Sequence, residues 1–127
     1  MEYSAIYHDM DKRFCYAIDK DLFVIRVQVK KDDMKEIILH CEDKYIPMDC
    51  KDTRKTILMK KIATSQFHDY YEAQLQMHLI CLRYYFEFTD TQGKKIYYGN
   101  YEFYKECITN RYRMFDCPQN LREEEMF

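Results

Sequence analysis

Hydrophobic and polar residues alternate along most of this chain, and the alternation is strictest between positions 23 and 43. From Phe23 to Lys30 every second residue is aromatic or β-branched, and positions 37–42 again place an apolar residue at every second site. A period of two residues indicates a strand with one buried face and one solvated face. Because the charged connector at 31–35 is short, we expect the two runs to form neighbouring antiparallel strands.

The same pattern predicts further short strands on both sides of this segment. They are expected at 4–8, 14–18, 55–64, 67–77, 82–88 and 94–98, whereas the runs at 101–104 and 113–117 are short and show the pattern only weakly. The turn at 89–93 ends in Gly93, which suits a positive φ and should join two of these strands into a hairpin. The loop at 44–53 contains Pro47, which interrupts strand pairing. The pattern therefore predicts an all-β fold, an immunoglobulin-like antiparallel β-sandwich of about seven to nine strands.

Length and composition agree with a single sandwich domain. The chain has 127 residues, enough for one domain with its own core. Aromatic residues make up 17% of the chain and Gly and Pro number two each, which favours strands. We place the sandwich at 1–117. Positions 118–127 are polar, include Glu123, Glu124 and Glu125, and are interpreted as the start of a solvated linker.

The charge distribution argues against several classes of partner. The chain has 20 basic and 22 acidic residues, mixed along its length, so no basic stripe is present to follow a phosphate backbone. No apolar run is long enough to span a membrane. The first residues lack the basic and apolar regions of a signal peptide, so we expect a cytoplasmic protein that binds neither nucleic acid nor membrane.

The six cysteines are interpreted as free thiols. No CxxC pair occurs, and a chain of this length has a core without disulfides. Three of them, Cys15, Cys41 and Cys81, fall within apolar strand patterns, where a thiol packs as a small hydrophobic group.

No group of residues in the sequence has a recognisable catalytic or metal-binding pattern. Two groups combine a histidine with nearby aspartates: His8 with Asp9 and Asp11, and His68 with Asp69. Adjacent strand residues point to opposite faces, so neither group converges, and solvated turn residues are the favoured interpretation. His40 and Cys41 fail as a nucleophile–base pair for the same reason. The sequence therefore predicts no catalytic residue, no metal and no cofactor.

The segments of the chain, read in order, carry a family resemblance. They include AIYH at 5–8, DYYEA at 69–73 and LRYYF at 82–86, with further matches at 14–17, 23–31, 43–45, 93–98 and 103–104. This series resembles the N-terminal immunoglobulin-like domain, carbohydrate-binding module family 34, of the cyclomaltodextrinase, neopullulanase and maltogenic amylase group of glycoside hydrolase family 13. The resemblance spans nearly the whole chain and rests on the ordered series rather than on one motif.

The resemblance implies an accessory role in an enzyme that hydrolyses α-glucans. In that group the domain precedes a catalytic (β/α)₈ barrel with two aspartates and a glutamate, and no residue of this chain matches them. The domain often mediates dimerisation and covers the active site of the partner subunit, which favours cyclodextrins and short maltooligosaccharides. The implied partners are therefore the barrel of its own chain, the barrel of a partner subunit, and an α-glucan or cyclodextrin.

Tyrosines supply the candidate sugar contacts. Tyr45 matches the tyrosine that reaches the partner's substrate in that group, although Lys44 stands where Pro is common and the chain has no Trp. Tyr70, Tyr85 and Tyr97 fall on the solvated faces of candidate strands and could form a flat platform for a glucan chain. Cross-strand aromatic pairing or a protein interface would explain the same three residues.

Three functions compete at this point. The leading one is the accessory domain just described, and the alternative is a stand-alone immunoglobulin-like domain that binds another protein. An independent small enzyme has little support, because no pair of titratable groups has a recognisable role. A barrel encoded soon after Phe127 would separate the first two.

Overall fold

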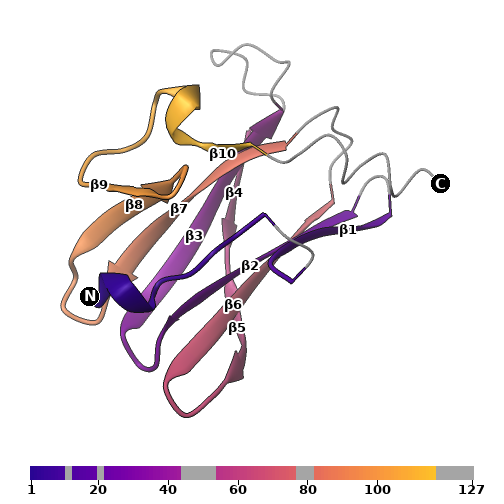
Figure 1. Cartoon of the computed structure of the whole chain (residues 1–127). Coiled ribbons are helices and arrows are strands. Elements are labelled where there is room, and N and C mark those ends of the chain that lie inside the picture. Colours follow the sequence, from indigo (N-terminus) through magenta and orange to yellow (C-terminus); the bar gives the residue numbers. More distant parts are fainter. Residues whose placement is uncertain (11–12, 20–21, 44–53, 77–81, 117–127) are drawn as a thin grey trace.

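The computed structural model describes residues 1–10, 13–19, 22–43, 54–76 and 82–116, and its strands form two antiparallel sheets packed face to face (Figure 1). One sheet has the order β1 (Cys15–Asp19), β2 (Leu22–Lys30), β6 (His68–Gln76), β5 (Lys60–Thr64). The other has the order β4 (Lys55–Leu58), β3 (Met34–Asp43), β7 (Leu82–Asp90), β8 (Lys95–Gly99), β9 (Glu102–Tyr104), and β10 (Phe115–Asp116) also pairs with β7. The predicted all-β immunoglobulin-like sandwich is confirmed. The described residues form ten strands, slightly more than predicted.

The alternating residues form the core as the sequence predicts. On β2 and β6, Phe23 lies opposite Leu75 and Val27 opposite Tyr71, and all four side chains are buried. Every second residue of β7, from Leu82 to Phe88, is buried in the core between the two sheets. Each such side chain contributes roughly 1.5–3 kcal/mol when it is fully removed from water. The core between the sheets is therefore built largely by the two central strand pairs.

The segment predicted as one strand at 55–64 is two strands in different sheets. β4 pairs with β3, whereas β5 pairs with β6. The chain crosses between the sheets at Met59, whose side chain is buried and whose backbone N–H donates to the Ile37 carbonyl at 2.9 Å. Positions 57–59 are all apolar and positions 60–61 are both lysine, so a two-residue alternation does not locate the point where the chain changes sheets.

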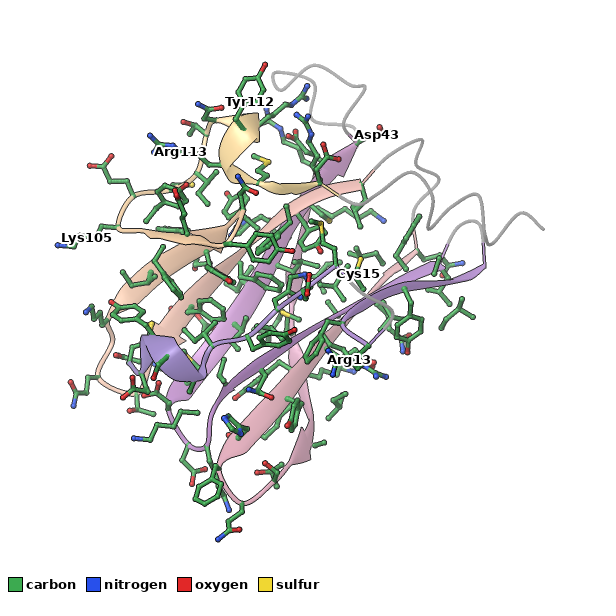
Figure 2. The ribbon with its side chains drawn as sticks, in the orientation of Figure 1. Arg13, Cys15, Asp43, Lys105, Tyr112 and Arg113 are labelled. Carbon is green, nitrogen blue, oxygen red and sulfur yellow. The ribbon has the colours of Figure 1, made fainter. Side chains whose placement is uncertain are left out.

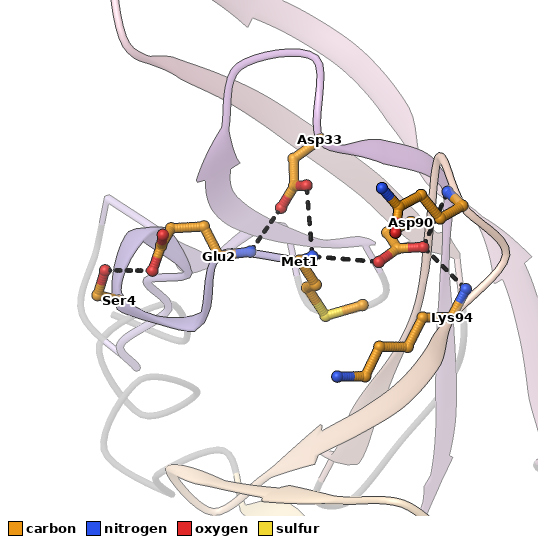
Figure 3. Close-up of polar contacts among 7 residues, drawn as sticks. Met1, Glu2, Ser4, Asp33, Asp90 and Lys94 are labelled. Atoms are coloured by element: carbon orange, nitrogen blue, oxygen red, sulfur yellow. Dashed lines mark hydrogen bonds and ion pairs between the residues drawn. The ribbon is translucent and has the colours of Figure 1, made fainter.

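The N-terminal segment also differs from the prediction of a strand at 4–8. A short 3₁₀ helix, η1 (Tyr3–Ala5), is followed by a single bridge between Tyr7 and Gln28. The α-amino group of Met1 lies 3.2 Å from Asp90 Oδ2 and 3.8 Å from Asp33 Oδ1 (Figure 3). This segment is therefore held by the β2–β3 and β7–β8 turns rather than by a continuous ladder.

The β7–β8 turn is shaped by Asp90 and by a glycine. Asp90 Oδ1 accepts hydrogen bonds from the backbone N–H groups of Gln92 and Lys94, at 3.0 and 2.8 Å. Gly93 has φ +87°, which confirms the predicted positive φ. An aspartate that bonds the backbone N–H groups after it is a common way to close a tight turn.

Acid should weaken the sandwich through Asp69 and Asp90, which are both buried. Desolvation would raise the pKa of each carboxyl group. Hydrogen bonds from Thr64, Asp32 and Lys61 to Asp69, and from Lys94, Gln92 and the Met1 amine to Asp90, outweigh it and hold both pKa values below their usual range. Because the folded pKa is depressed, this stabilisation is present above about pH 4 and is lost as the pH falls through the folded values.

Urea unfolding at a series of pH values tests this expectation. The wild-type chain should lose stability steadily below about pH 4, and Asp90→Asn should be less stable at neutral pH but lose less on acidification. If both proteins lost the same amount of stability between neutral and acidic pH, Asp90 would not be responsible for the acid sensitivity.

Candidate functional site

The outer face of the six-stranded sheet carries a polar row across three strands. Thr56 of β4, His40 of β3 and Tyr85 of β7 are opposite one another in register. The His40 ring stacks on Tyr85, with centroids 4.7 Å apart and planes 15° from parallel. His40 Nε2 lies 3.1 Å from Glu87 Oε1, and Nδ1 lies 3.4 Å from Thr56 Oγ1. These contacts fix the orientation of the imidazole ring between Thr56 and Tyr85.

A buried ion pair lies beside this row. Glu42 is 4% exposed and accepts hydrogen bonds from the Arg111 guanidinium at 3.0 Å and 3.4 Å, one to each carboxylate oxygen. Arg54 Nε lies 3.9 Å from the same carboxylate. A paired arginine–carboxylate contact of this kind is both strong and directional. The negative charge of Glu42 is therefore balanced by two guanidinium groups.

The segment 105–114, which we call the strap, packs on the outer face of the same sheet (Figure 1). Ile108 and Met114 are buried against Tyr85. The Tyr85 hydroxyl lies 3.4 Å from Cys107 Sγ, and burial, followed by this contact, raises the pKa of Tyr85. The strap contains a short 3₁₀ helix, η2 (Arg111–Arg113), whose first turn is capped by the Asn110 side chain. Figure 2 shows Arg113 and Tyr112 at the same end of the sandwich as Asp43.

Between β3, β4, β7 and the strap lies a cavity of about 500 Å³. Its lining includes His40, Glu42, Arg54, Thr56, Ile108 and Met114. The mixture of an imidazole plane, hydroxyl groups, a neutralised ion pair and apolar side chains suits a small ligand with both apolar and hydrogen-bonding faces. Glu42 and Arg54 also flank positions 44–53 in the sequence.

The three tyrosines predicted as a platform do not come together. Tyr70 lies on β6 in the four-stranded sheet, opposite Gln28, whereas Tyr85 and Tyr97 lie in the other sheet. The rings of Tyr85 and Tyr97 are 6.3 Å apart and tilted by 55°, and Tyr85 is buried. The prediction of one flat platform is wrong, because β6 and β7 follow each other in the chain but pair with different strands. Tyr45 lies outside the described residues.

His8 and Asp69 are not the solvated turn residues that the sequence suggested. His8 is 1% exposed; its Nδ1 donates to the Arg26 carbonyl and its Nε2 accepts from the Tyr84 hydroxyl, both at 2.7 Å. Asp69 is 2% exposed and accepts from Thr64 Oγ1. Both polar side chains are buried because other segments of the fold supply their hydrogen-bond partners. Within the part of the chain that the structure describes, no group of three or more His, Cys, Asp or Glu residues could hold a metal ion.

The cysteines that the structure describes are thiols outside any disulfide, as expected. Cys15 and Cys41 are buried and Cys107 is exposed. Burial raises the pKa of the Cys41 thiol to about 12, and its Sγ donates to the Lys55 carbonyl at 3.6 Å. A buried thiol with a raised pKa is unreactive, so Cys41 serves as a packing group. Cys81 lies outside the described residues.

The residues that sequence reasoning missed are those on the strap and their partners in the sheet. Ile108 and Met114 are isolated apolar residues in a polar stretch, which is a signal for a local contact. Arg111 gives no such signal, because its partner Glu42 is far away in the chain. Among the described residues there is no helix long and apolar enough to cross a membrane.

Comparison with known protein families places the whole sandwich in one group. The family described as "Alpha amylase, N-terminal ig-like domain" matches residues 1–119. A maltogenic alpha-amylase from Bacillus acidopullulyticus is 40% identical over 86 residues, which is 68% of this chain and 15% of that protein. An intracellular maltogenic amylase from Bacillus subtilis (strain 168) is 32% identical over 100 residues, 79% of this chain and 17% of the relative.

A solved structure shows the same fold. A cyclomaltodextrinase superposes with a TM-score of 0.83 at 30% identity, covering 93% of this chain and 20% of that one. The chain thus spans about a fifth or less of the length of each of these relatives.

Proposed function

The chain belongs to the family of N-terminal immunoglobulin-like domains of α-amylases, and from this premise we propose that it is a non-catalytic accessory domain of an enzyme that hydrolyses α-glucans. The observation that carries the proposal is the family match over residues 1–119. The described residues contain no (β/α)₈ barrel, a fold that needs about 250 residues. In the relatives, the matched region is a small part of a much longer protein.

We propose further that the domain acts by assembly. In this proposal it contributes to dimerisation, covers the active site of a partner subunit and contacts an α-glucan or cyclodextrin there, with Tyr45 as the contacting residue. The names of its relatives, maltogenic amylases and a cyclomaltodextrinase, support the class of substrate. The intracellular relative supports a cytoplasmic location for the parent enzyme.

Tyr45→Ala in the enzyme that carries this domain should change substrate preference. A tyrosine ring that narrows the cleft stacks on a compact cyclodextrin, whereas a long linear glucan in an open cleft loses less. We expect kcat/KM for cyclodextrin to fall by roughly 5- to 150-fold more than kcat/KM for the linear glucan, which corresponds to about 1–3 kcal/mol of lost transition-state binding. The measurement is the ratio of the two kcat/KM values, with the molecular mass of each variant determined by light scattering.

Two controls make the result interpretable. Tyr70→Ala changes a tyrosine of the four-stranded sheet and should leave the ratio unchanged. If the Tyr45→Ala enzyme were still a dimer and its ratio of kcat/KM values were unchanged, Tyr45 would not contact the substrate. If the wild-type enzyme were a monomer, the proposed role in dimerisation would be refuted.

A further inference from the structure

The α-amino group of Met1 lies where two turns of the sandwich meet (Figure 3). Its nitrogen is 3.2 Å from Asp90 Oδ2 and 3.8 Å from Asp33 Oδ1. Asp90 is the last residue of β7, and Asp33 lies in the connection between β2 and β3. The backbone N–H of Thr91 donates to the Asp33 carbonyl at 3.1 Å, so the two turns are also bonded directly to each other. The positive charge of the amino group therefore lies between two carboxylates at a junction of the fold.

The Asp90 carboxylate divides its hydrogen bonds between its own turn and the amino group. Oδ1 accepts from the backbone N–H groups of Gln92 and Lys94, whereas Oδ2 accepts from the Met1 ammonium. Asp90 is only 2% exposed, and a buried carboxylate is strongly destabilising once its partner cation is removed. The side-chain amine of Lys94 lies over the Tyr3 ring, 5.2 Å from its centroid. The Met1 ammonium therefore supplies Asp90 with both a donor and a compensating positive charge.

Positions 1–6, which we call the arm, come before the bridge between Tyr7 and Gln28 that joins the chain to β2. The backbone hydrogen bonds of η1 run within the arm itself. Tyr3 packs against the core, and its ring centroid lies 4.9 Å from that of Phe103. The arm is therefore held to the sandwich by side-chain packing and by the polar contacts of its first residues, rather than by a strand ladder.

We propose that the α-amino group of Met1 is a modification site, and that its acylation by an acyl thioester releases the arm from the sandwich. In this reaction the ammonium gives one proton to water, and the nitrogen bonds to the acyl carbon. The carbon–sulfur bond breaks, and the departing thiolate takes the second proton from the nitrogen. Acylation removes the positive charge and leaves a neutral amide N–H. Asp90 then lacks its cation, and the acyl group must be placed where the nitrogen now lies 3.2 Å from Oδ2.

Cys15 allows both forms of the chain to be made with the same amino-acid sequence. A peptide of positions 1–14, with a free or an acetylated α-amine and a C-terminal thioester, is ligated to a 15–127 fragment that begins with Cys15. The full-length product is refolded, and its intact mass confirms each form. NMR then measures the proximity of the Tyr3 and Phe103 rings by cross-relaxation, and the hydrogen-exchange rates of the backbone amides.

The acetylated chain should lose the contact between the Tyr3 and Phe103 rings. The Ile6 amide, which donates to the Tyr3 carbonyl within the arm, should exchange roughly tenfold faster, the effect of losing one charge-assisted hydrogen bond. The amides of Tyr7 and Gln28, which donate to each other's carbonyl groups at 2.8 Å, should exchange at the same rate in both forms.

Two substitutions test whether the amino group acts through Asp90. Asp90→Asn keeps an Oδ1 acceptor for the turn but removes the charge, so acetylation should then change the Ile6 exchange rate by less than about threefold. Glu2→Gln is the matched control, because it removes a carboxylate that accepts from the Ser4 hydroxyl at 2.8 Å. In the Glu2→Gln chain acetylation should retain its full effect.

Three outcomes would overturn the proposal. An acetylated chain with the same ring contact and the same exchange rates as the free form would refute the site. An equal effect of acetylation in the wild type and in Asp90→Asn would show that Asp90 is not the partner of the amino group. Faster exchange at Tyr7 and Gln28 would show that the arm is not released as a separate unit. The comparison of the two wild-type forms needs no substitution, so it decides the proposal even where Asp90→Asn does not fold.

Discussion

Gly99→Ala is expected to lower the free energy of unfolding by about 3 kcal/mol, toward the upper end of overpacking substitutions. An added Cβ would lie 2.1 Å from the Arg113 carbonyl oxygen and 3.0 Å from Ile108 Cδ1. The first of these atoms belongs to the backbone of the strap, so relief requires the whole strap to move. Because Ile108 also packs on Tyr85, the displacement should open the cavity as well as destabilise the sandwich.

Gly93→Ala is the matched control for this prediction. No atom lies within 4 Å of a Cβ at position 93, but the residue has φ +87°. Alanine at position 93 is destabilising only because of the positive φ, and we expect the free energy of unfolding to fall by about 1 kcal/mol. Urea unfolding of the wild type and the two variants measures the difference. Equal losses at both positions would show that the strap does not pack tightly against the end of β8.

His8→Ala should lower the free energy of unfolding by about 3–4 kcal/mol. The imidazole packs edge-on against Phe86 and Phe115, with ring centroids 4.9 and 4.8 Å away. Its removal leaves a cavity and deprives the Tyr84 hydroxyl and the Arg26 carbonyl of their short bonds to the ring. Tyr84 is fully buried, so water does not readily replace the lost bond.

Two further variants separate the packing of His8 from its hydrogen bonds. His8→Phe restores most of the ring volume but not the bonds, so an intermediate loss of about 1–3 kcal/mol is expected. His68→Ala removes a half-buried histidine near the start of β6 and should have an effect below about 1 kcal/mol. Thermal or urea unfolding measures all three. If His8→Phe were as stable as the wild type, the hydrogen bonds would contribute nothing and the site would be a packing position only.

The central strands and the orientation of their side chains follow from the sequence alone. On β2, β6 and β7 the alternation of residues identified the buried faces, because side-chain direction in a strand repeats every two residues whatever the strand pairs with. The turn at Gly93 followed from an equally local preference for positive φ. The ordered series of segments also identified the family that the match over residues 1–119 shows.

Which sheet each strand joins, and therefore which residues meet, was decided only by the tertiary structure. The chain crosses from one sheet to the other at Met59, and Tyr70 lies in a different sheet from Tyr85, yet no local feature of the sequence marks either change. His8 is buried because β2 and β7 supply its two partners. The cavity exists because Arg111 returns to Glu42 across a separation of 69 positions. Strand formation depends on neighbours in the sequence. Strand pairing and the hydrogen-bond partners of buried polar side chains depend on residues that only folding brings together, so no local pattern in the sequence predicts them.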